Sequence, residues 1–191
     1  MMRYIFLLLS TLTLSSCNTK NPNIVIKTEL GDITLELYPE KAPITVANFL
    51  QYIDEHRLDS TTFYRVVRDD NQEGKTVKIQ VIQGGLLEDD HPKMLPAIKH
   101  EGTKQTGIKH LRGVISMARY EPGTATSEFF ICMANEPELD EGGMRNSDGA
   151  GFAAFGKVIK GMAIAEKIHQ APAGNDQMLN PPILIYSIER K

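Results

Sequence analysis

The stretch IVIKTELGDITLEL, residues 24–37, alternates apolar and polar side chains on both sides of the pair Gly31-Asp32. Alternation with a period of two is the pattern of a β-strand with one buried face. A two-residue turn with Gly at its first position is typical of a β-hairpin. We therefore predict two strands, 24–30 and 33–37, joined by a turn at Gly31-Asp32.

Pro43 begins the next segment, residues 44–56, in which Val46, Phe49 and Ile53 recur at helical spacing. Pro is tolerated in the first turn of a helix because the N–H that it lacks has no intrahelical partner there. Apolar side chains three and four residues apart predict an amphipathic helix. One helix is therefore expected directly after the hairpin.

The rest of the chain repeats the strand pattern more often than the helix pattern. Further strands are predicted at residues 61–67, 77–83, 113–118, 128–133, 153–159 and 183–189, and a second short helix at 162–169. Closing a sheet on itself removes the open edges that so many short strands would otherwise expose. The predicted fold class is mainly β: a closed eight-stranded antiparallel barrel capped by two α-helices, formed by one domain over residues 24–191.

The composition is that of an ordinary globular protein. Of 191 residues, 41% are hydrophobic and 24% charged, which excludes collagen-like, disordered and disulfide-stapled chains. Lys and Arg number 21 against 24 Asp and Glu, for a formal net charge of −3, and no basic run occurs. Proteins that bind nucleic acid concentrate positive charge along one surface, so no nucleic-acid partner is expected.

The N-terminal residues differ from the rest of the chain. Residues 4–14 form an almost wholly apolar run after Arg3. The run is shorter than the roughly 20 residues that span a bilayer, but it fits the central region of a secretory signal peptide. Residues 14–17, LSSC, resemble a bacterial lipobox, whose Cys is acylated and becomes the first residue after cleavage. A plain signal or anchor is the alternative.

These features predict three segments: a lipoprotein signal peptide at 1–16, a lipidated Cys17 with a polar tether to residue 23, and the folded domain from residue 24 onward. The predicted location is the bacterial cell envelope, lipid-anchored and facing the periplasm. Contact with the membrane is then expected through the lipid anchor only.

Reactive side chains form no recognisable cluster in the sequence. The five His residues are scattered without the spacing of metal ligands, and neither a metal ion nor a cofactor is expected. Cys132 lies in an apolar run, which favours inert core packing over a nucleophile. The acidic residues Glu136, Glu138, Asp140 and Glu141 lack the alternating ligand pattern of a calcium loop and favour a solvated turn.

Phe129 and Phe130 are adjacent in a predicted strand, so their side chains point to opposite faces. Phe130 then shares its face with Glu128. On the wall of a barrel one of the two rings fills the core, and the other faces outward beside polar groups. An outward Phe in such a setting suggests a binding groove.

Two polar residues in further strands permit two interpretations. By alternation Arg65 shares a face with Phe63 and Val67, and Gln83 shares a face with Val81. Arg65 is either a solvated strand residue or part of a groove. Gln83 is either a turn residue before the glycines that follow it or part of the same groove.

Several short motifs occur in order along the domain: TELGDI (28–33), LYPEKAP (37–43), VANF (46–49), FYRVV (63–67), IQGG (82–85), GVISMA (113–118) and SEFFI (127–131). Together they resemble the cyclophilin family of peptidyl-prolyl cis-trans isomerases, over residues 24–190. The resemblance implies an eight-stranded barrel with two helices and a proline-binding groove on its outside. It also implies an enzyme that accelerates rotation about X–Pro bonds without a cofactor.

The same resemblance assigns roles to residues of the groove. It places the catalytic arginine at Arg65, the groove glutamine at Gln83 and the phenylalanine beneath the proline ring at Phe130. The substrate-binding positions that it implies are Val81, Ala118, Arg119, Glu128, Leu139 and Phe152, with Ala118 and Arg119 acting through their backbone.

The sequence departs from the family pattern around this groove. Residues 68–79 form a long insertion after the arginine strand, and residues 140–151 expand a second loop. Gln80 occupies a position that is usually aromatic. Glu128 stands where Gln is common, and Phe152 where His is common in eukaryotic members. The rim of the groove is therefore expected to be remodelled.

The predicted function is that of a monomeric isomerase that acts on proline-containing unfolded or loop segments of secreted proteins and assists their folding. One alternative is a non-catalytic proline-peptide-binding or chaperone lipoprotein that has lost turnover through Gln80 and the insertion. Another is a structural lipoprotein whose barrel binds no proline peptide.

Overall fold

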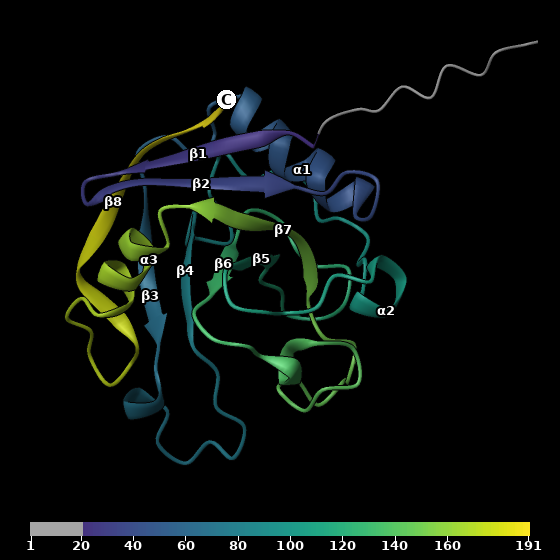
Figure 1. Ribbon diagram of the computed structural model, residues 1–191, viewed down its shortest axis with the longest axis vertical. Coiled ribbons are helices and arrows are strands. Elements are labelled where there is room, and N and C mark those ends of the chain that lie inside the picture. Colours follow the sequence, from purple (N-terminus) through teal and green to yellow (C-terminus); the bar gives the residue numbers. More distant parts are fainter. Residues whose placement is uncertain (1–20) are drawn as a thin grey trace, which may run out of the picture.

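The computed structural model describes residues 21–191 (Figure 1). Its strands are β1 (Asn23–Thr28), β2 (Gly31–Leu37), β3 (Thr61–Val67), β4 (Val81–Gly85), β5 (Val114–Met117), β6 (Phe129–Cys132), β7 (Ala153–Lys160) and β8 (Met178–Arg190). Its helices are α1 (Pro43–Asp54), α2 (Thr103–Thr106) and α3 (Met162–His169), with 3₁₀ turns η1 (Asp69–Asn71) and η2 (Pro137–Leu139).

The strands close into a barrel in the order β1-β2-β7-β5-β6-β4-β3-β8. All neighbouring strands are antiparallel, and the first strand pairs with the last, with Ile24 opposite Arg190. Helix α1 contacts β7 and β8, and α3 contacts β2, β3 and β4 (Figure 1). Because side chains of both helices join the barrel's core, the predicted barrel with two capping helices is confirmed.

The hairpin turn lies two residues earlier than predicted. Thr28 pairs directly with Gly31, so the turn residues are Glu29 and Leu30, and the prediction of a turn at Gly31-Asp32 is wrong. The Thr28 hydroxyl donates to the Gly31 carbonyl at 2.7 Å and accepts the Leu30 N–H at 3.2 Å, which fixes the turn. Gly31 has a φ of +126°, which favours glycine. Because the shift is even, the apolar side chains of the two strands still face inward, whereas Leu30 lies exposed in the turn: the inward residues are Ile24, Ile26, Ile33, Leu35 and Leu37.

Strands β4 and β8 differ most from their predicted ranges, whereas β3 and α3 match theirs. Strand β4 begins at Val81, not at 77, because the side chain of Gln72 bonds both backbone groups of Ile79 and replaces strand pairing there. Strand β8 begins at Met178, five residues before the predicted start at 183. Its prolines interrupt the alternation of apolar and polar residues that predicts a strand.

Four phenylalanines form the centre of the barrel. Phe49 of α1 lies 5.4 Å from Phe129 and 5.1 Å from Phe155, and Phe63 lies 5.7 Å from Phe129, between ring centroids. All four are fully buried. Cys132 is also fully buried, and burial raises the pKa of its thiol, as expected for inert packing.

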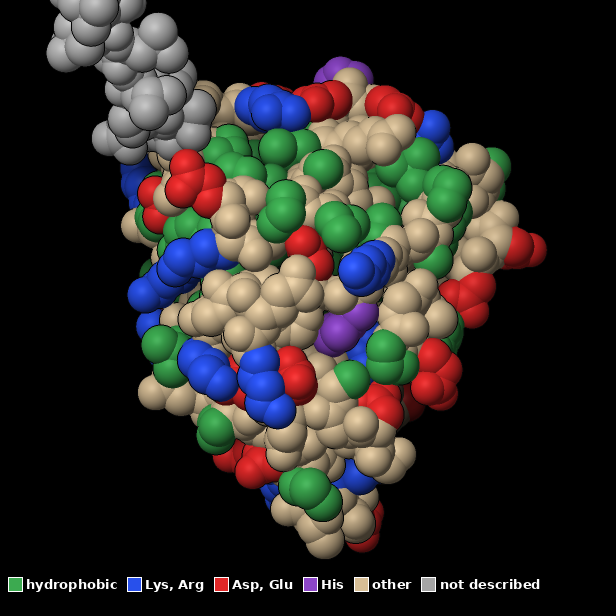
Figure 2. Space-filling model, turned by 90° about the vertical axis from the view of Figure 1, so that its right-hand side faces the viewer, with side chains coloured by type: hydrophobic (Ala, Val, Ile, Leu, Met, Phe, Trp, Pro, Cys, Tyr) green, Lys and Arg blue, Asp and Glu red, His purple; other side chains and the backbone are tan. Residues whose placement is uncertain are grey.

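The predicted signal peptide and Cys17 lie outside the described residues. Strand β1 begins at Asn23, one residue before the predicted start of the domain. Between residues 21 and 191, no helix combines the length and apolar character needed to cross a membrane. On the face shown in Figure 2, acidic and basic side chains are interspersed and form no continuous basic stripe.

Candidate functional site

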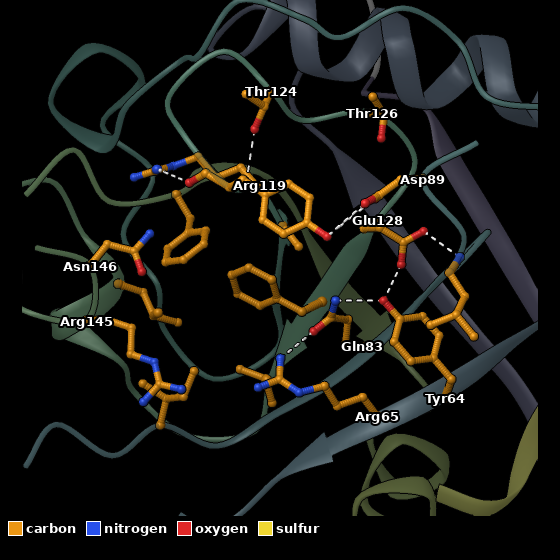
Figure 3. Close-up of a pocket in the computed structure, with 18 of the residues that line it drawn as sticks. Tyr64, Arg65, Gln83, Asp89, Arg119, Thr124, Thr126, Glu128, Arg145 and Asn146 are labelled. Carbon is orange, nitrogen blue, oxygen red and sulfur yellow. Dashed lines mark hydrogen bonds between the residues drawn. The ribbon is translucent and has the colours of Figure 1, made fainter. Parts of the chain in front are cut away.

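A pocket of about 690 Å³ opens on the outside of the barrel (Figure 3). Its volume falls within the range of small-ligand sites. The pocket brings together every residue that the sequence assigned to the groove: Arg65, Val81, Gln83, Ala118, Arg119, Glu128, Phe130, Leu139 and Phe152. These residues come from β3, β4 and β6 and from the loops after β5 and before β7.

The floor of the pocket is a small apolar cluster separate from the barrel's core. It consists of Val67, Ile79, Val81, Phe130, Cys132 and Leu139, with Ala118 and Phe152 packed against it. The ring of Phe152 meets the ring of Phe130 edge-on, at 5.4 Å between centroids. The predicted outward orientation of Phe130 and inward orientation of Phe129 are both observed.

His110 lies behind the ring of Phe130, an arrangement that the sequence did not suggest. The two rings stack at 6.0 Å with an interplanar angle of 18°. His110 is held by Asp140 at 2.8 Å through Nδ1 and by Ser116 at 2.9 Å through Nε2. Ser116 is fully buried, so this Ser-His-Asp chain has no access to a substrate. It supports the pocket floor instead.

A β-bulge places Arg65 in the pocket. Phe63 pairs with Gly84 and Arg65 with Gln83, which leaves Tyr64 as an extra residue on β3. Phe63 consequently points into the core, while Tyr64 and Arg65 both line the pocket. The prediction that Arg65 shares a face with Phe63 is therefore wrong, because simple alternation does not allow for a bulge.

Two glutamine side chains hold the guanidinium of Arg65. Arg65 Nη1 donates to Gln83 Oε1 at 2.7 Å, and Nε and Nη2 donate to Gln177 Oε1 at 3.1 and 2.6 Å. Each Nη atom carries a second hydrogen that remains available to a ligand. Burial, and then the charge of Arg145, lower the pKa of Arg65. An arginine still remains cationic at neutral pH.

The hydrogen-bond chain continues from Gln83 to Glu128 (Figure 3). Gln83 Nε2 donates to the Tyr64 hydroxyl at 2.7 Å, and that hydroxyl donates to the carboxylate of Glu128. Burial, and then the charge of Glu128, raise the pKa of Tyr64, so the phenol stays protonated. Glu128 also accepts the Ser127 hydroxyl and the Leu87 N–H, each at 2.9 Å. The chain fixes the amide of Gln83 with its oxygen toward Arg65.

Part of the backbone beside the pocket already forms hydrogen bonds within the barrel. The Ala118 N–H donates to the Glu128 carbonyl at 2.8 Å, so this amide is not available to a peptide. The side chain of Arg119 is buried, with Nη1 and Nη2 donating to Asp148 at 2.8 and 2.9 Å and Nε donating to the Gly151 carbonyl at 2.8 Å. Arg119 therefore anchors the expanded loop.

The insertion changes which residue fills the pocket wall. Gln80, at the usually aromatic position, does not line the pocket, and its side chain donates to Asp69 at 3.2 Å. Ile79 lines the pocket in its place. Arg145 and Asn146 of the expanded loop reach the same pocket. Both departures from the family pattern thus remodel the rim, as expected.

Sequence reasoning missed Tyr64, Ile79, Arg145 and Gln177. Alternation places Tyr64 and Arg65 on opposite faces, and only the bulge brings both into the pocket. The position of Tyr64 next to Arg65 in the sequence was nevertheless a signal. Gln177 is 112 residues from Arg65 along the chain, and no local pattern connects the two. Ile79 and Arg145 lie in the insertion and the expanded loop, where no periodicity guides the assignment.

Comparisons with known proteins agree with this geometry. The family model described as "Cyclophilin type peptidyl-prolyl cis-trans isomerase/CLD" matches residues 23–190. A peptidyl-prolyl cis-trans isomerase of Acinetobacter baylyi is 32% identical over 196 residues, covering 100% of this chain and 97% of the relative. Peptidyl-prolyl cis-trans isomerase A of Dickeya dadantii is 35% identical, covering 88% of this chain and 84% of the relative.

Among solved structures, a cyclophilin-type isomerase of Cryptosporidium parvum matches with a TM-score of 0.70 at 22% identity, covering 90% of this chain and 98% of its own. A structure of that protein in the presence of the dipeptide Ala-Pro matches with a TM-score of 0.69. At this identity the likeness concerns the fold. Together with the family model and the relatives, it leads to one conclusion: the chain belongs to the cyclophilin-type peptidyl-prolyl cis-trans isomerase family.

Proposed function

We propose that this isomerase works as a monomer on proline-containing segments of secreted proteins, from a lipid anchor at Cys17, and that it assists their folding. Arg65 supplies the catalytic hydrogen bond, and the cluster around Phe130 holds the proline ring. The observation that carries the proposal is the position of Arg65, fixed by Gln83 and Gln177 at the edge of an apolar pocket.

The chemistry requires no nucleophile. Rotation about an X–Pro amide has a barrier of about 18–20 kcal/mol because the resonance of the amide must be broken. Uncatalysed exchange takes tens to hundreds of seconds. As the amide twists, the lone pair returns to the prolyl nitrogen, which becomes a hydrogen-bond acceptor only then. A donor aimed at this nitrogen therefore binds the transition state more strongly than the ground state.

Arg65 fits this role because its guanidinium is already oriented. Its contacts with the two glutamines leave an N–H on each Nη atom for the twisted amide. One preorganised donor of this kind contributes about 3–4 kcal/mol, or roughly 10²–10³ in rate. Orientation before the substrate arrives avoids the cost of ordering the side chain in the transition state.

The apolar floor supports rotation of one part of the peptide against the other. Phe130, Val81 and Leu139 are almost fully buried and offer a surface suited to a proline ring. Gln83, and the backbone at Ala118 and Arg119 apart from the bonded Ala118 N–H, also line the pocket and would hold the flanking peptide. The ring and the flanking segment are thus held by different walls.

The features that suggested a non-catalytic binding protein leave Arg65 and the apolar floor in place. Gln80 lies outside it, and the insertion supplies the apolar Ile79 at its wall. A proline-exchange assay by NMR, with the full chain in detergent micelles and a peptide containing Ala-Pro, tests the proposal. We expect exchange to accelerate in proportion to the concentration of the chain. Binding without acceleration would indicate the non-catalytic alternative, and absence of binding would indicate a structural lipoprotein.

The anchor has a test of its own. The LSSC motif at residues 14–17 supports acylation of Cys17, and the short stretch from there to Asn23 would connect the lipid to the first strand. The wild type should partition with bacterial membranes and carry an acyl mass on its N-terminal peptide. Cys17→Ser should carry no acyl mass, with the domain folded and isomerase activity retained. A soluble wild type without an acyl mass would refute the anchor and the envelope location that depends on it.

A further inference from the structure

The arginines of residues 21–191 divide into two groups. Five of them form ion pairs with a carboxylate: Arg57 with Glu55, Arg68 with Asp70, Arg112 with Glu166, Arg119 with Asp148 and Arg190 with Asp54. Arg65 and Arg145 have no carboxylate within 4.0 Å in this part of the chain, and both line the pocket. Arginine that is partly buried without a carboxylate is unusual for a protein with a net negative charge.

Neutral groups from the insertion hold Arg145 at the rim. Its Nη1 donates to Gln72 Oε1 at 3.1 Å and to the Val77 carbonyl at 2.8 Å. Gln72 is only 2% exposed and is itself fixed by Ile79. The backbone N–H of Arg145 donates to the Glu138 carbonyl at 3.1 Å. The side chain is therefore oriented by neutral groups, and no carboxylate within residues 21–191 is in contact with it.

The positive charge of Arg145 acts on Arg65 along the same side of the pocket (Figure 3). Burial lowers the pKa of Arg145, and burial together with the charge of Arg145 lowers the pKa of Arg65. Glu136 attracts Arg145 from beyond contact distance, but its carboxylate accepts the Gln80 N–H at 2.8 Å. Two like charges beside one cavity repel each other, which raises the free energy of the protein. An anion bound between them would lower that free energy.

The acidic groups of the pocket lie on a different side. Figure 3 shows Arg65 and Arg145 along the lower rim and Asp89 and Glu128 at the upper right. Asp89 accepts the Tyr120 hydroxyl at 3.1 Å, and Glu128 accepts the hydroxyl of Tyr64. Within residues 21–191, the carboxylates that line the pocket thus lie away from Arg65 and Arg145 at the positive rim, beside the apolar floor where a proline ring would bind.

We propose that the pocket selects prolines that have an Asp or Glu as an immediate neighbour in the peptide, with that carboxylate bound by Arg145 together with Arg65. This substrate class rests on the proposed function, because it assumes that the proline ring occupies the floor around Phe130. An arginine fork binds a carboxylate strongly when its geometry is fixed beforehand. General attraction does not explain such a preference, because the chain has a formal net charge of −3.

Four peptides with blocked termini test this preference: Ala-Ala-Pro-Asp-Ala and Ala-Asp-Pro-Ala-Ala, and the same two with Asn in place of Asp. NMR exchange with the full chain gives kcat/KM for each, and titration gives Kd. In at least one of the two positions, the Asp peptide should exceed its Asn counterpart about tenfold, the size of one charge-assisted hydrogen bond. Equal values for Asp and Asn in both positions would overturn the proposal.

Variants show whether a preference for Asp comes from Arg145 at the rim or from the overall charge of the protein. Arg145→Gln should abolish the preference, so that each Asp peptide and its Asn counterpart have equal kcat/KM, and Arg145→Lys should retain part of it. Arg112→Gln is the matched control, because it removes one positive charge from the ion pair with Glu166, away from the pocket. It should keep the full preference. A preference that survives Arg145→Gln, or that disappears in Arg112→Gln, would contradict the proposal.

The outcomes also separate this inference from the proposed function. Turnover of the Asn peptides without any preference for Asp would leave the isomerase intact and refute the acidic selectivity. Absence of turnover with all four peptides, combined with an Asp preference in Kd that Arg145→Gln removes, would support the selectivity and refute the catalytic proposal.

Discussion

Phe129 and Phe130 are neighbours on one strand, yet the two faces of the barrel wall around them are built differently. Phe129 belongs to a continuous apolar core with Phe49 and Phe63. Phe130 belongs to a cluster of six buried residues, behind which His110 and Asp140 form hydrogen bonds. The inner face is held together by apolar packing, whereas the outer face depends on polar contacts that orient each group. Stability and catalysis are therefore expected to respond to different substitutions.

The largest effect on stability should come from the inner face. Phe129→Ala should lower the free energy of unfolding by about 3–5 kcal/mol, because the cavity that it leaves is surrounded by rigid barrel strands. Phe130→Ala should cost less, about 1–3 kcal/mol, because its ring borders an open pocket, but it should weaken binding of proline peptides. Denaturant titration of both variants measures the difference. Equal losses of stability would show that the two faces are not distinct.

An intermediate effect is expected at Gln177, which positions Arg65. Gln177→Gly removes the acceptor for two Arg65 nitrogens and suits the φ of +70° at this position. We expect kcat/KM to fall about tenfold, as for loss of a hydrogen bond to a charged group, with stability maintained. In the Arg65→Ala background the same change should have almost no further effect. Additive losses would mean that Gln177 acts independently of Arg65.

The smallest effect concerns the loop that borders the pocket. Hydrogen bonds from Arg119, and then from the Ala150 N–H, lower the pKa of Asp148 to about 2. A lowered pKa means that the contribution to stability is complete above the ordinary pKa of 3.8 and is lost as the pH falls through about 2. Asp148→Asn should therefore lower Tm slightly at pH 6, and the difference from the wild type should be clearly smaller at pH 2.

Glu73→Gln is the control for this measurement, because Glu73 is an exposed carboxylate in the insertion. It should leave Tm unchanged at both pH values. A difference between Asp148→Asn and the wild type that is as large at pH 2 as at pH 6 would show that the ion pair with Arg119 is not its cause.

Most strands of the barrel were predictable because their apolar and polar residues alternate with a period of two. The inward side chains of the hairpin and the opposite orientations of Phe129 and Phe130 follow from alternation alone. The position of the hairpin turn did not, because the side chain of Thr28 fixes it two residues before the glycine that marked it.

The residues that line the pocket were predictable, but the contacts that orient their side chains were not. The resemblance to a family supplied the nine groove residues, and the structure brings them into one pocket. The contacts that hold Arg65 were not accessible, because Tyr64 reaches the pocket through a bulge and Gln177 through a long-range contact. Such contacts depend on the tertiary structure and leave no periodic trace in the sequence.

The most direct test of the account is to measure Arg65→Ala for both turnover and stability. We expect kcat/KM for an Ala-Pro peptide to fall by roughly 10²-fold or more, as for loss of one preorganised donor. The free energy of unfolding should stay within about 1 kcal/mol of the wild type, because the side chain lies outside the core. Unchanged kcat/KM, or a loss of stability comparable to that of Phe129→Ala, would contradict the assignment of catalysis to the outer face.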